Sequence, residues 1–252
     1  IPSFKNPNVE YSILQKISTH PKLKKFGYSG EGFINETTDK VFLSKKSGPR
    51  TERIIRGMHI KRYFVDIITE WKMPSYVFKE KFLEKKPQIR DTYKKAYLVA
   101  KEILHPGEPR KLNFGLNENA LLLGNSVRYF VLETKDLTPK YLLALLNSCL
   151  LEWFFLLFSY TYHITSHELD NLPIVRATPN QQAPIISLVS AIIQKKKEYH
   201  AISQNIEDYI DFGKANLIRL DEFLKDALDD FDVVSSLKVK HDNFDALRLR
   251  IE

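Results

Sequence analysis

Cysteine is almost absent from the sequence, because Cys149 is the only one among 252 residues. A single thiol cannot close a disulfide within the chain or supply the thiolate cluster of a structural zinc site. We therefore expect a protein of a reducing compartment, the cytoplasm. The N-terminus also lacks the charged and then apolar layout of a secretion signal, and a start at Ile1 rather than Met suggests a piece of a longer polypeptide.

Catalytic motifs are scarce too. A metal-dependent nuclease would need a Pro-Asp pair and then Glu-x-Lys; no Pro-Asp pair occurs, although Glu70-Trp71-Lys72 and Glu133-Thr134-Lys135 match the second half. His163 and His167 stand four residues apart, a spacing that zinc sites use on a helix, and Glu168 follows them. No third ligand is evident, so a polar loop or a helix end is the favoured interpretation. We predict no catalytic residue and no metal site in this chain.

Positive charge is concentrated in the first part of the sequence. Residues 1–180 hold 28 Lys and Arg against 18 Asp and Glu, a net of +10, while residues 181–252 hold 10 against 13, a net of −3. Such an asymmetry favours a polyanionic partner for the first part, although solubility alone accounts for many basic proteins.

One apolar stretch, residues 139–158, dominates the hydrophobic pattern. Its leucines and aromatic residues recur at three- and four-residue spacing, which predicts a buried, aromatic-rich α-helix. Thr138 can cap its first turn through the hydroxyl. Asn147 and Ser148 interrupt the apolar run and, when buried, need partners from another segment. These two residues and Glu152 argue against the alternative that this stretch crosses a membrane.

The chain before this helix is typical of a mixed β region. Residues 26–44 and 112–133 each hold two apolar runs around a polar turn, which predicts a hairpin, or in the second case a strand-turn-strand in a buried sheet. Residues 72–95 predict extended chain and then a short helix, and residues 97–104 either a strand or a short helix.

Both ends of the chain are predicted to be helical. A short amphipathic helix should end before His20, and residues 181–200 predict a longer one. Its apolar side is formed by Ile185, Leu188, Val189, Ile192, Ile193 and Tyr199. The pattern continues to Gly213, another helix follows over residues 217–231, and the tail after it predicts a strand and a last short helix. The fold class is therefore α+β: a mixed β-sheet region with short helices, a buried aromatic-rich helix and a C-terminal helical segment.

Residues 45–62 are the densest basic stretch, and Tyr63 and Phe64 follow directly. Interleaved guanidinium and aromatic groups suit nucleic acid, because Arg can grip phosphate or pair with guanine and Tyr can stack or donate to phosphate. The alternative is a solvated basic loop beside a strand. The candidate DNA-binding residues are Lys45 and Lys46, as phosphate contacts, and Arg50, Arg53, Arg56, Lys61, Arg62 and Tyr63.

Three short motifs resemble a known family. They are IIRGMHIKRY at 54–63, YLLALLNS at 141–148 and LDNLPI at 169–174, the last followed by a glutamine-bearing helix start. Their order and spacing resemble the TaqI-like C-terminal specificity domain, and a weaker resemblance extends from Gly32 to Tyr199. That family supplies the target-recognition part of type II restriction-modification methyltransferases and is similar to the recognition domains of type I specificity subunits.

The resemblance implies sequence-specific binding of double-stranded DNA. Methyl transfer, expected at adenine N6, would be done by a methyltransferase domain upstream of this chain or in another polypeptide, and that domain would bind S-adenosylmethionine. This chain has no G-x-G loop after a strand, and Asn6-Pro7-Asn8 is not the Asn/Asp-Pro-Pro-Tyr/Phe motif that holds a flipped base in those enzymes. No cofactor site is therefore predicted here.

The resemblance also suggests a division of the chain. We expect a lead-in at 1–26, a target-recognition domain at 27–180, and a helical C-terminal segment at 181–252 that packs on it or on a partner domain. Two alternatives stay open: a helical interaction scaffold that does not read DNA, and a metal-dependent nuclease domain. Arg56 to Tyr63 belong to the resembling motif, whereas the other candidate residues are chosen on charge alone.

Overall fold

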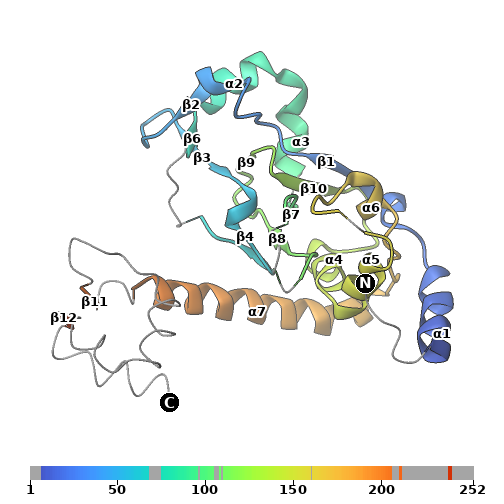
Figure 1. The fold of residues 1–252 in the computed structure, drawn as a ribbon. Helices are drawn as coiled ribbons and strands as arrows, with labels where there is room; N and C mark the ends of the chain where they lie inside the picture. Colours follow the sequence, from blue (N-terminus) through green and yellow to red (C-terminus); the bar gives the residue numbers. More distant parts are fainter. Residues whose placement is uncertain are drawn as a thin grey trace. The chain divides into compact units, whose positions relative to one another are not determined.

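The fold is described from a computed structural model of the chain (Figure 1). The described residues are 7–67, 75–95, 97–104, 108, 110–159, 161–205, 210–211 and 238–239. Contacts divide the chain into two compact units, Ile1–Ile193 and Gln194–Glu252, and each is treated by itself.

The first sheet has four strands, all antiparallel, in the order β1-β10-β7-β8. Their bounds are Gly27–Glu31 for β1, Val127–Leu132 for β10, Leu98–Lys101 for β7 and Phe114–Leu116 for β8. Of the two structures that the sequence allowed for residues 97–104, the strand is confirmed, because Leu98, Val99 and Ala100 all pair with β10 and are buried.

A second sheet has the order β2-β6-β3-β9, and its β3–β9 pair is parallel. Its strands are β2 (Leu43–Ser44), β6 (Tyr76–Val77), β3 (Glu52–Ile55) and β9 (Leu122–Leu123), and β4 (Ile60–Lys61) forms a separate hairpin with β5 (Phe64–Val65). The described residues also contain four 3-10 turns: η1 (Leu23–Lys25), which precedes β1, and η2 (Lys40–Phe42), η3 (Gly57–His59) and η4 (Pro87–Ile89).

The hairpin predicted over residues 26–44 is wrong, because the strands β1 and β2 belong to different sheets. Of the two structures predicted for residues 112–133, the strand-turn-strand is confirmed, because β9 and β10 also belong to different sheets. After β1 the chain leaves the first sheet and runs beside β9 of the second. The Ile34 amide donates there to the Leu123 carbonyl at 3.0 Å. Across the turn after β9, the Gly124 amide donates to the Ile55 carbonyl at 2.8 Å.

The described part of the chain contains α1 (Pro7–Ser18), α2 (Lys79–Lys85), α3 (Arg90–Lys95), α4 (Pro139–Leu146), α5 (Cys149–Leu156), α6 (Ser166–Asp170) and α7 (Pro179–Asn205). Together with the sheets they confirm the α+β class. The predicted helix before His20 is present as α1. The single short helix predicted within residues 72–95 is two helices, α2 and α3, separated by η4. None of the helices in the described ranges has both the length and the apolar character needed to cross a bilayer.

The predicted aromatic-rich helix is two helices. Thr138 caps α4 as expected, since its hydroxyl accepts from the Tyr141 amide at 3.3 Å. Asn147 ends α4, and Ser148 caps α5 by accepting from the Leu151 amide at 3.1 Å. The prediction of one continuous helix is therefore wrong, because a stop residue and a start residue lie side by side at the break.

Helix α7 confirms the amphipathic helix predicted over 181–200. Val189 and Ile193 are buried as expected, but Leu188 and Tyr199 are 64% and 74% exposed, so their assignment to the buried side is wrong. In the second unit, Ile210–Asp211 pair with Lys238–Val239 as strands β11 and β12. The helical pattern predicted to run on to Gly213 is thus wrong at residues 210–211, a strand in the tail is confirmed, and the helix predicted over 217–231 lies outside the described residues.

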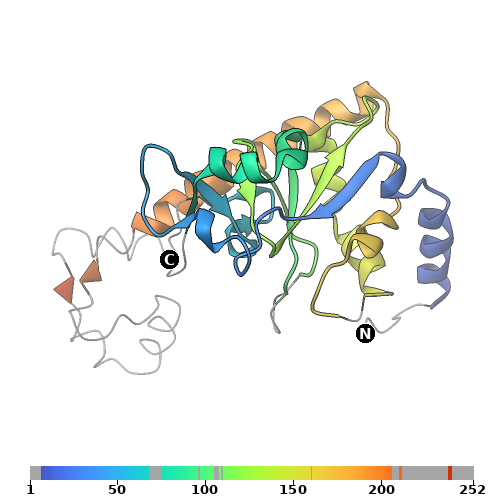
Figure 2. The ribbon, with the colours of Figure 1, turned by 90° about the horizontal axis from the view of Figure 1, so that it is seen from above.

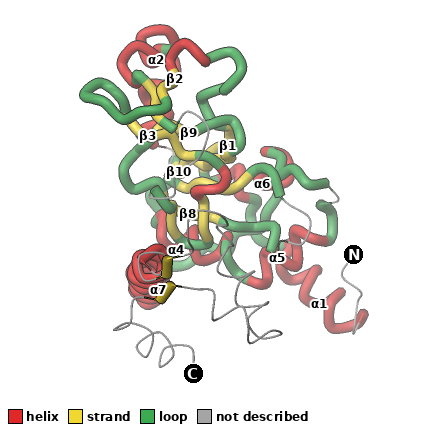
Figure 3. The backbone as a smooth tube through the Cα atoms, turned by 60° about the vertical axis from the view of Figure 1, so that its left-hand side comes forward, coloured by secondary structure: helices red, strands yellow, loops and turns green. Residues whose placement is uncertain are grey.

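The inner strands β10 and β7 of the first sheet are buried on both faces. Along β10, Phe130 packs in one core with the buried residues of α4 and α5, whereas Tyr129 and Val131 pack in a second core with Ile54, Phe82 and other residues of the second sheet and α2. Figures 1 and 3 show the same layering, with the second sheet on one side of β10 and α4 on the other. Seen from above in Figure 2, α1 stands at one edge of the first unit.

Gly115 gives a direct test of this packing. A Cβ at this buried position would lie 2.6 Å from the Phe64 carbonyl oxygen, where β8 passes under the β4–β5 hairpin. We expect Gly115→Ala to lower the free energy of unfolding by about 1–3 kcal/mol in urea titrations, because backbone must shift to admit the methyl group. Gly48→Ala is the control: its nearest contact would be 3.9 Å away, so we expect a change of no more than about 0.5 kcal/mol.

Candidate nucleic-acid interface

The first group of candidate residues lies on the loop between β2 and β3. Lys45, Lys46 and Arg50 are all exposed there. The loop is braced from within, because the Gly48 amide donates to Thr51 Oγ1 at 2.8 Å and the Thr51 hydroxyl donates back to the Gly48 carbonyl at 3.0 Å. Three cations are therefore presented to solvent on an ordered turn, which suits contacts with phosphate. We call them the loop cations.

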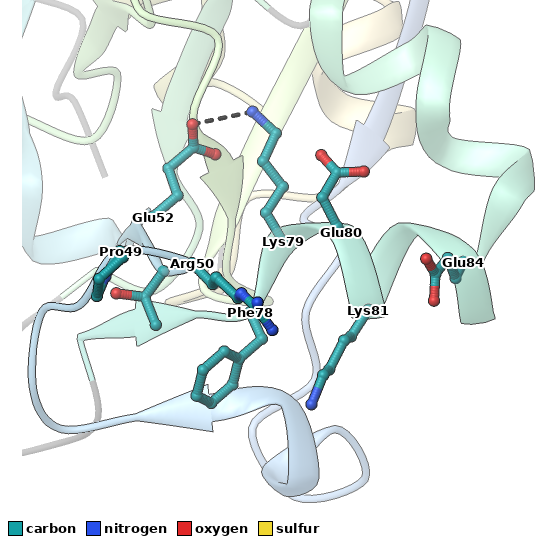
Figure 4. A pocket seen from close by; sticks show the side chains of 9 residues that line it. Pro49, Arg50, Glu52, Phe78, Lys79, Glu80, Lys81 and Glu84 are labelled. Atoms are coloured by element: carbon teal, nitrogen blue, oxygen red, sulfur yellow. Dashed lines mark hydrogen bonds and ion pairs between the residues drawn. The ribbon is translucent and has the colours of Figure 1, made fainter.

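A pocket of about 590 Å³ opens beside this loop (Figure 4). Its lining combines loop residues with residues of α2: Pro49, Arg50, Thr51, Glu52, Phe78, Lys79, Glu80, Lys81 and Glu84. Three basic and three acidic side chains balance there, so the pocket itself does not attract an anion strongly.

Lys79 and Glu52 form an ion pair in this lining, with Nζ and Oε1 2.9 Å apart. Burial by itself lowers the pKa of Lys79, but the hydrogen bond and charge of Glu52, together with Tyr93, outweigh it and raise that pKa above its ordinary value. The Lys79 ammonium also lies 5.0 Å from the Tyr93 ring centroid. The Lys79 ammonium therefore interacts with Glu52 and Tyr93 of the fold and is not presented to a ligand.

Arg53 and Arg56 are placed differently from the loop cations. Arg53 is half-buried, and its guanidinium lies 5.9 Å from the ring centroid of Tyr76 on the neighbouring strand. The Arg56 side chain is only 6% exposed and forms an ion pair with Glu36. The prediction that Arg56 contacts DNA from the surface is therefore wrong. Its buried side chain instead pairs with Glu36, in the segment after β1.

The remaining candidates lie on the β4–β5 hairpin. Lys61 is exposed. Arg62 Nη2 donates to the Asn147 carbonyl at 2.6 Å, and its guanidinium lies 5.2 Å from the Tyr63 ring centroid. Tyr63 is only 9% exposed, so the interpretation of its ring as a stacking surface for DNA is corrected here to a buried role.

The structure adds residues that the sequence analysis did not single out as a site. Arg110 Nη2 donates to the carbonyls of Asn147 and Ser148 at 3.3 and 3.0 Å. Glu152 is 8% exposed and accepts from the amides of Lys111 and Leu112 at 2.7 and 2.8 Å. A carboxylate within an apolar run was the available signal, since such a group needs hydrogen-bond donors close by.

The weaker catalytic candidates are not assembled into a site. Within the ranges described, His167 belongs to α6, whereas His163 lies outside that helix and bridges to Ile103, so the two imidazoles do not share a helical face. No group of three or more His, Cys, Asp or Glu residues in those ranges could hold a metal ion. Glu133 and Lys135 are exposed after the end of β10, and Glu70 and Lys72 lie outside the described residues.

Fold and site together define an α+β domain that carries exposed cations on one loop and on one hairpin turn. Residues 52–174 match the sequence model of the TaqI-like C-terminal specificity domain, which confirms the resemblance over that stretch. The solved structures that match include one from a study of complex assembly and conformational transition of the type I restriction-modification system. The identity to that chain is 12% and the TM-score is 0.39, over 80% of this chain and 51% of that one, so this chain spans about half its length. No curated protein matches.

Proposed function

We propose that this chain binds double-stranded DNA and selects the target sequence for a restriction-modification DNA methyltransferase. The observation that carries the proposal is the match of residues 52–174 to a specificity domain, next to exposed loop cations. The methyl group would be transferred, at adenine N6, by a separate domain that binds S-adenosylmethionine and meets the DNA in the cytoplasm. This chain would contribute recognition and no catalytic group.

The roles proposed for the candidate residues differ with their exposure to solvent. The loop cations Lys45, Lys46 and Arg50 would contact phosphates, which fixes the register of the domain on the duplex without reading sequence. Arg56 and Tyr63 are buried and would act through the fold. Sequence would be read by side chains on turns that reach base edges in a groove.

The proposal is tested by selection from a pool of duplexes with about 20 randomised base pairs, a length that exceeds a single-domain footprint. The full chain is immobilised, and bound duplexes are amplified and sequenced over successive rounds at low and moderate salt. We expect one short motif to be enriched. Absence of any enriched motif, at a salt concentration where duplex is still retained, would contradict sequence recognition, and absence of retention at low salt would favour the scaffold alternative.

A further inference from the structure

The β4–β5 hairpin has an unusual turn. Lys61 pairs with Phe64, so only Arg62 and Tyr63 connect the two strands. Tyr63 has a φ of 82°, a left-handed conformation that glycine or asparagine normally supplies in a tight turn. A bulky residue held in this region is strained, and such strain persists only where surrounding contacts fix the backbone.

Those contacts come from β8. The Tyr63 amide donates to the Phe114 carbonyl at 2.7 Å. The fully buried Asn147 side chain holds the same residue from the other side: its Oδ1 accepts from the Phe114 amide and its Nδ2 donates to the Phe114 carbonyl, both at 3.0 Å. A strained turn is thus hydrogen-bonded to a carbonyl that is itself fixed by a buried amide.

Arg62, the arginine of the turn, also contacts Asn147. Arg62 donates to the Asn147 carbonyl, and Arg110 donates to the same carbonyl and to that of Ser148. Both guanidiniums meet the C-terminal end of α4, where the helix dipole favours positive charge. Arg62 and Arg110 are therefore engaged within the fold, whereas Lys61 carries an exposed ammonium on the same hairpin.

We infer that the β4–β5 turn is a specificity-determining element, in which Lys61 contacts a base edge and Arg62 and Asn147 are positioning residues. The inference rests on the proposed function and deepens it. Reading a base edge requires a side chain that extends from a fixed backbone, and the hydrogen bonds through Phe114 and Asn147 hold the backbone of the turn that follows Lys61.

The test measures affinity of the full chain for the enriched duplex and for a scrambled duplex of the same composition. Lys61→Gln is expected to reduce the preference for the enriched duplex by about tenfold, because one base contact is lost, with little change for the scrambled duplex. Arg62→Lys keeps the charge but not the planar, stacked guanidinium, and it is expected to reduce the same preference to a similar degree. Arg90→Gln, which removes an exposed charge on α3, is the matched control and should leave the preference unchanged.

The outcomes separate this inference from the proposed function. A wild-type chain that enriches no motif contradicts the proposed function itself. If the wild type enriches a motif and both variants keep the same preference while unfolding at the wild-type urea concentration, the turn does not determine specificity and the proposed function stands. If Arg62→Lys is destabilised, Lys61→Gln decides the matter alone, because its side chain is on the surface.

Discussion

Replacing Glu152 by alanine is expected to lower the free energy of unfolding by about 3 kcal/mol, because two buried backbone amides lose a charged acceptor at once. The carboxylate accepts from the amides of Lys111 and Leu112, and Leu112 is fully buried. Water cannot readily take over the second contact without opening the packing between the 110–112 segment and α5. The measurement is the midpoint and slope of urea unfolding, followed by circular dichroism.

Two further variants test whether the loss of stability comes from the buried hydrogen bonds of Glu152. Glu152→Gln keeps one acceptor oxygen but turns an amide donor toward a backbone amide and loses the charge near Arg110, whose Nη2 lies 3.9 Å from Oε2. We expect a loss of about 1–2 kcal/mol, between wild type and alanine. Glu133→Ala, an exposed glutamate after β10, should change the free energy by no more than about 0.5 kcal/mol. Equal losses for Glu133 and Glu152 would show that the buried contacts contribute nothing.

The polar residues of the apolar stretch illustrate what could be predicted from sequence. A buried Asn147 was expected to contact another segment, and it does so through both atoms of its amide with Phe114. The identity of that segment could not be predicted, because hydrogen-bonding demand is local while its partner lies 33 positions earlier. The helix break was readable in principle, since Asn is common at helix ends and Ser at starts.

Strand existence was predicted better than strand pairing. The apolar runs at 122–123 and 127–132 are strands, but each pairs in a different sheet. Alternation and turn residues describe a single strand and its ends, and the choice of partner depends on tertiary packing. Gly32 shows the missing information: a Cβ there would lie 1.9 Å from the Gly124 carbonyl oxygen, a close approach between segments that no local pattern reveals.

The candidate site, too, could be predicted from the sequence only in part. Positive charge and aromatic neighbours could be read from the sequence, and Lys45, Lys46, Arg50 and Lys61 are indeed exposed. Burial could not be read, because the Arg56 side chain is covered only when Glu36, twenty positions away, is brought beside it. Of neighbouring basic residues in one motif, some therefore present charge to solvent and others hold the fold together.

Removing the loop cations should have the largest effect on DNA affinity. In Lys45→Gln/Lys46→Gln/Arg50→Gln we expect binding of a duplex to weaken by about 100-fold at low salt, and the slope of log affinity against log salt to fall by about 2.7 in magnitude, because three phosphate contacts are lost. The difference from wild type should accordingly shrink by about 40-fold between about 50 and 200 mM salt. Fluorescence anisotropy of a labelled duplex across a salt series measures both quantities.

The control for this experiment lies elsewhere in the same basic region. Arg90→Gln/Lys94→Gln/Lys95→Gln removes the same charge from exposed positions on α3, so it changes net charge without touching the loop. If DNA meets the loop specifically, this variant should lose less than about threefold in affinity and keep the wild-type slope, since distant exposed charges are largely screened at this salt. Equal slopes for the two triple variants would mean that the duplex responds to net charge alone, and the loop would lose its assigned role as the phosphate-contacting surface.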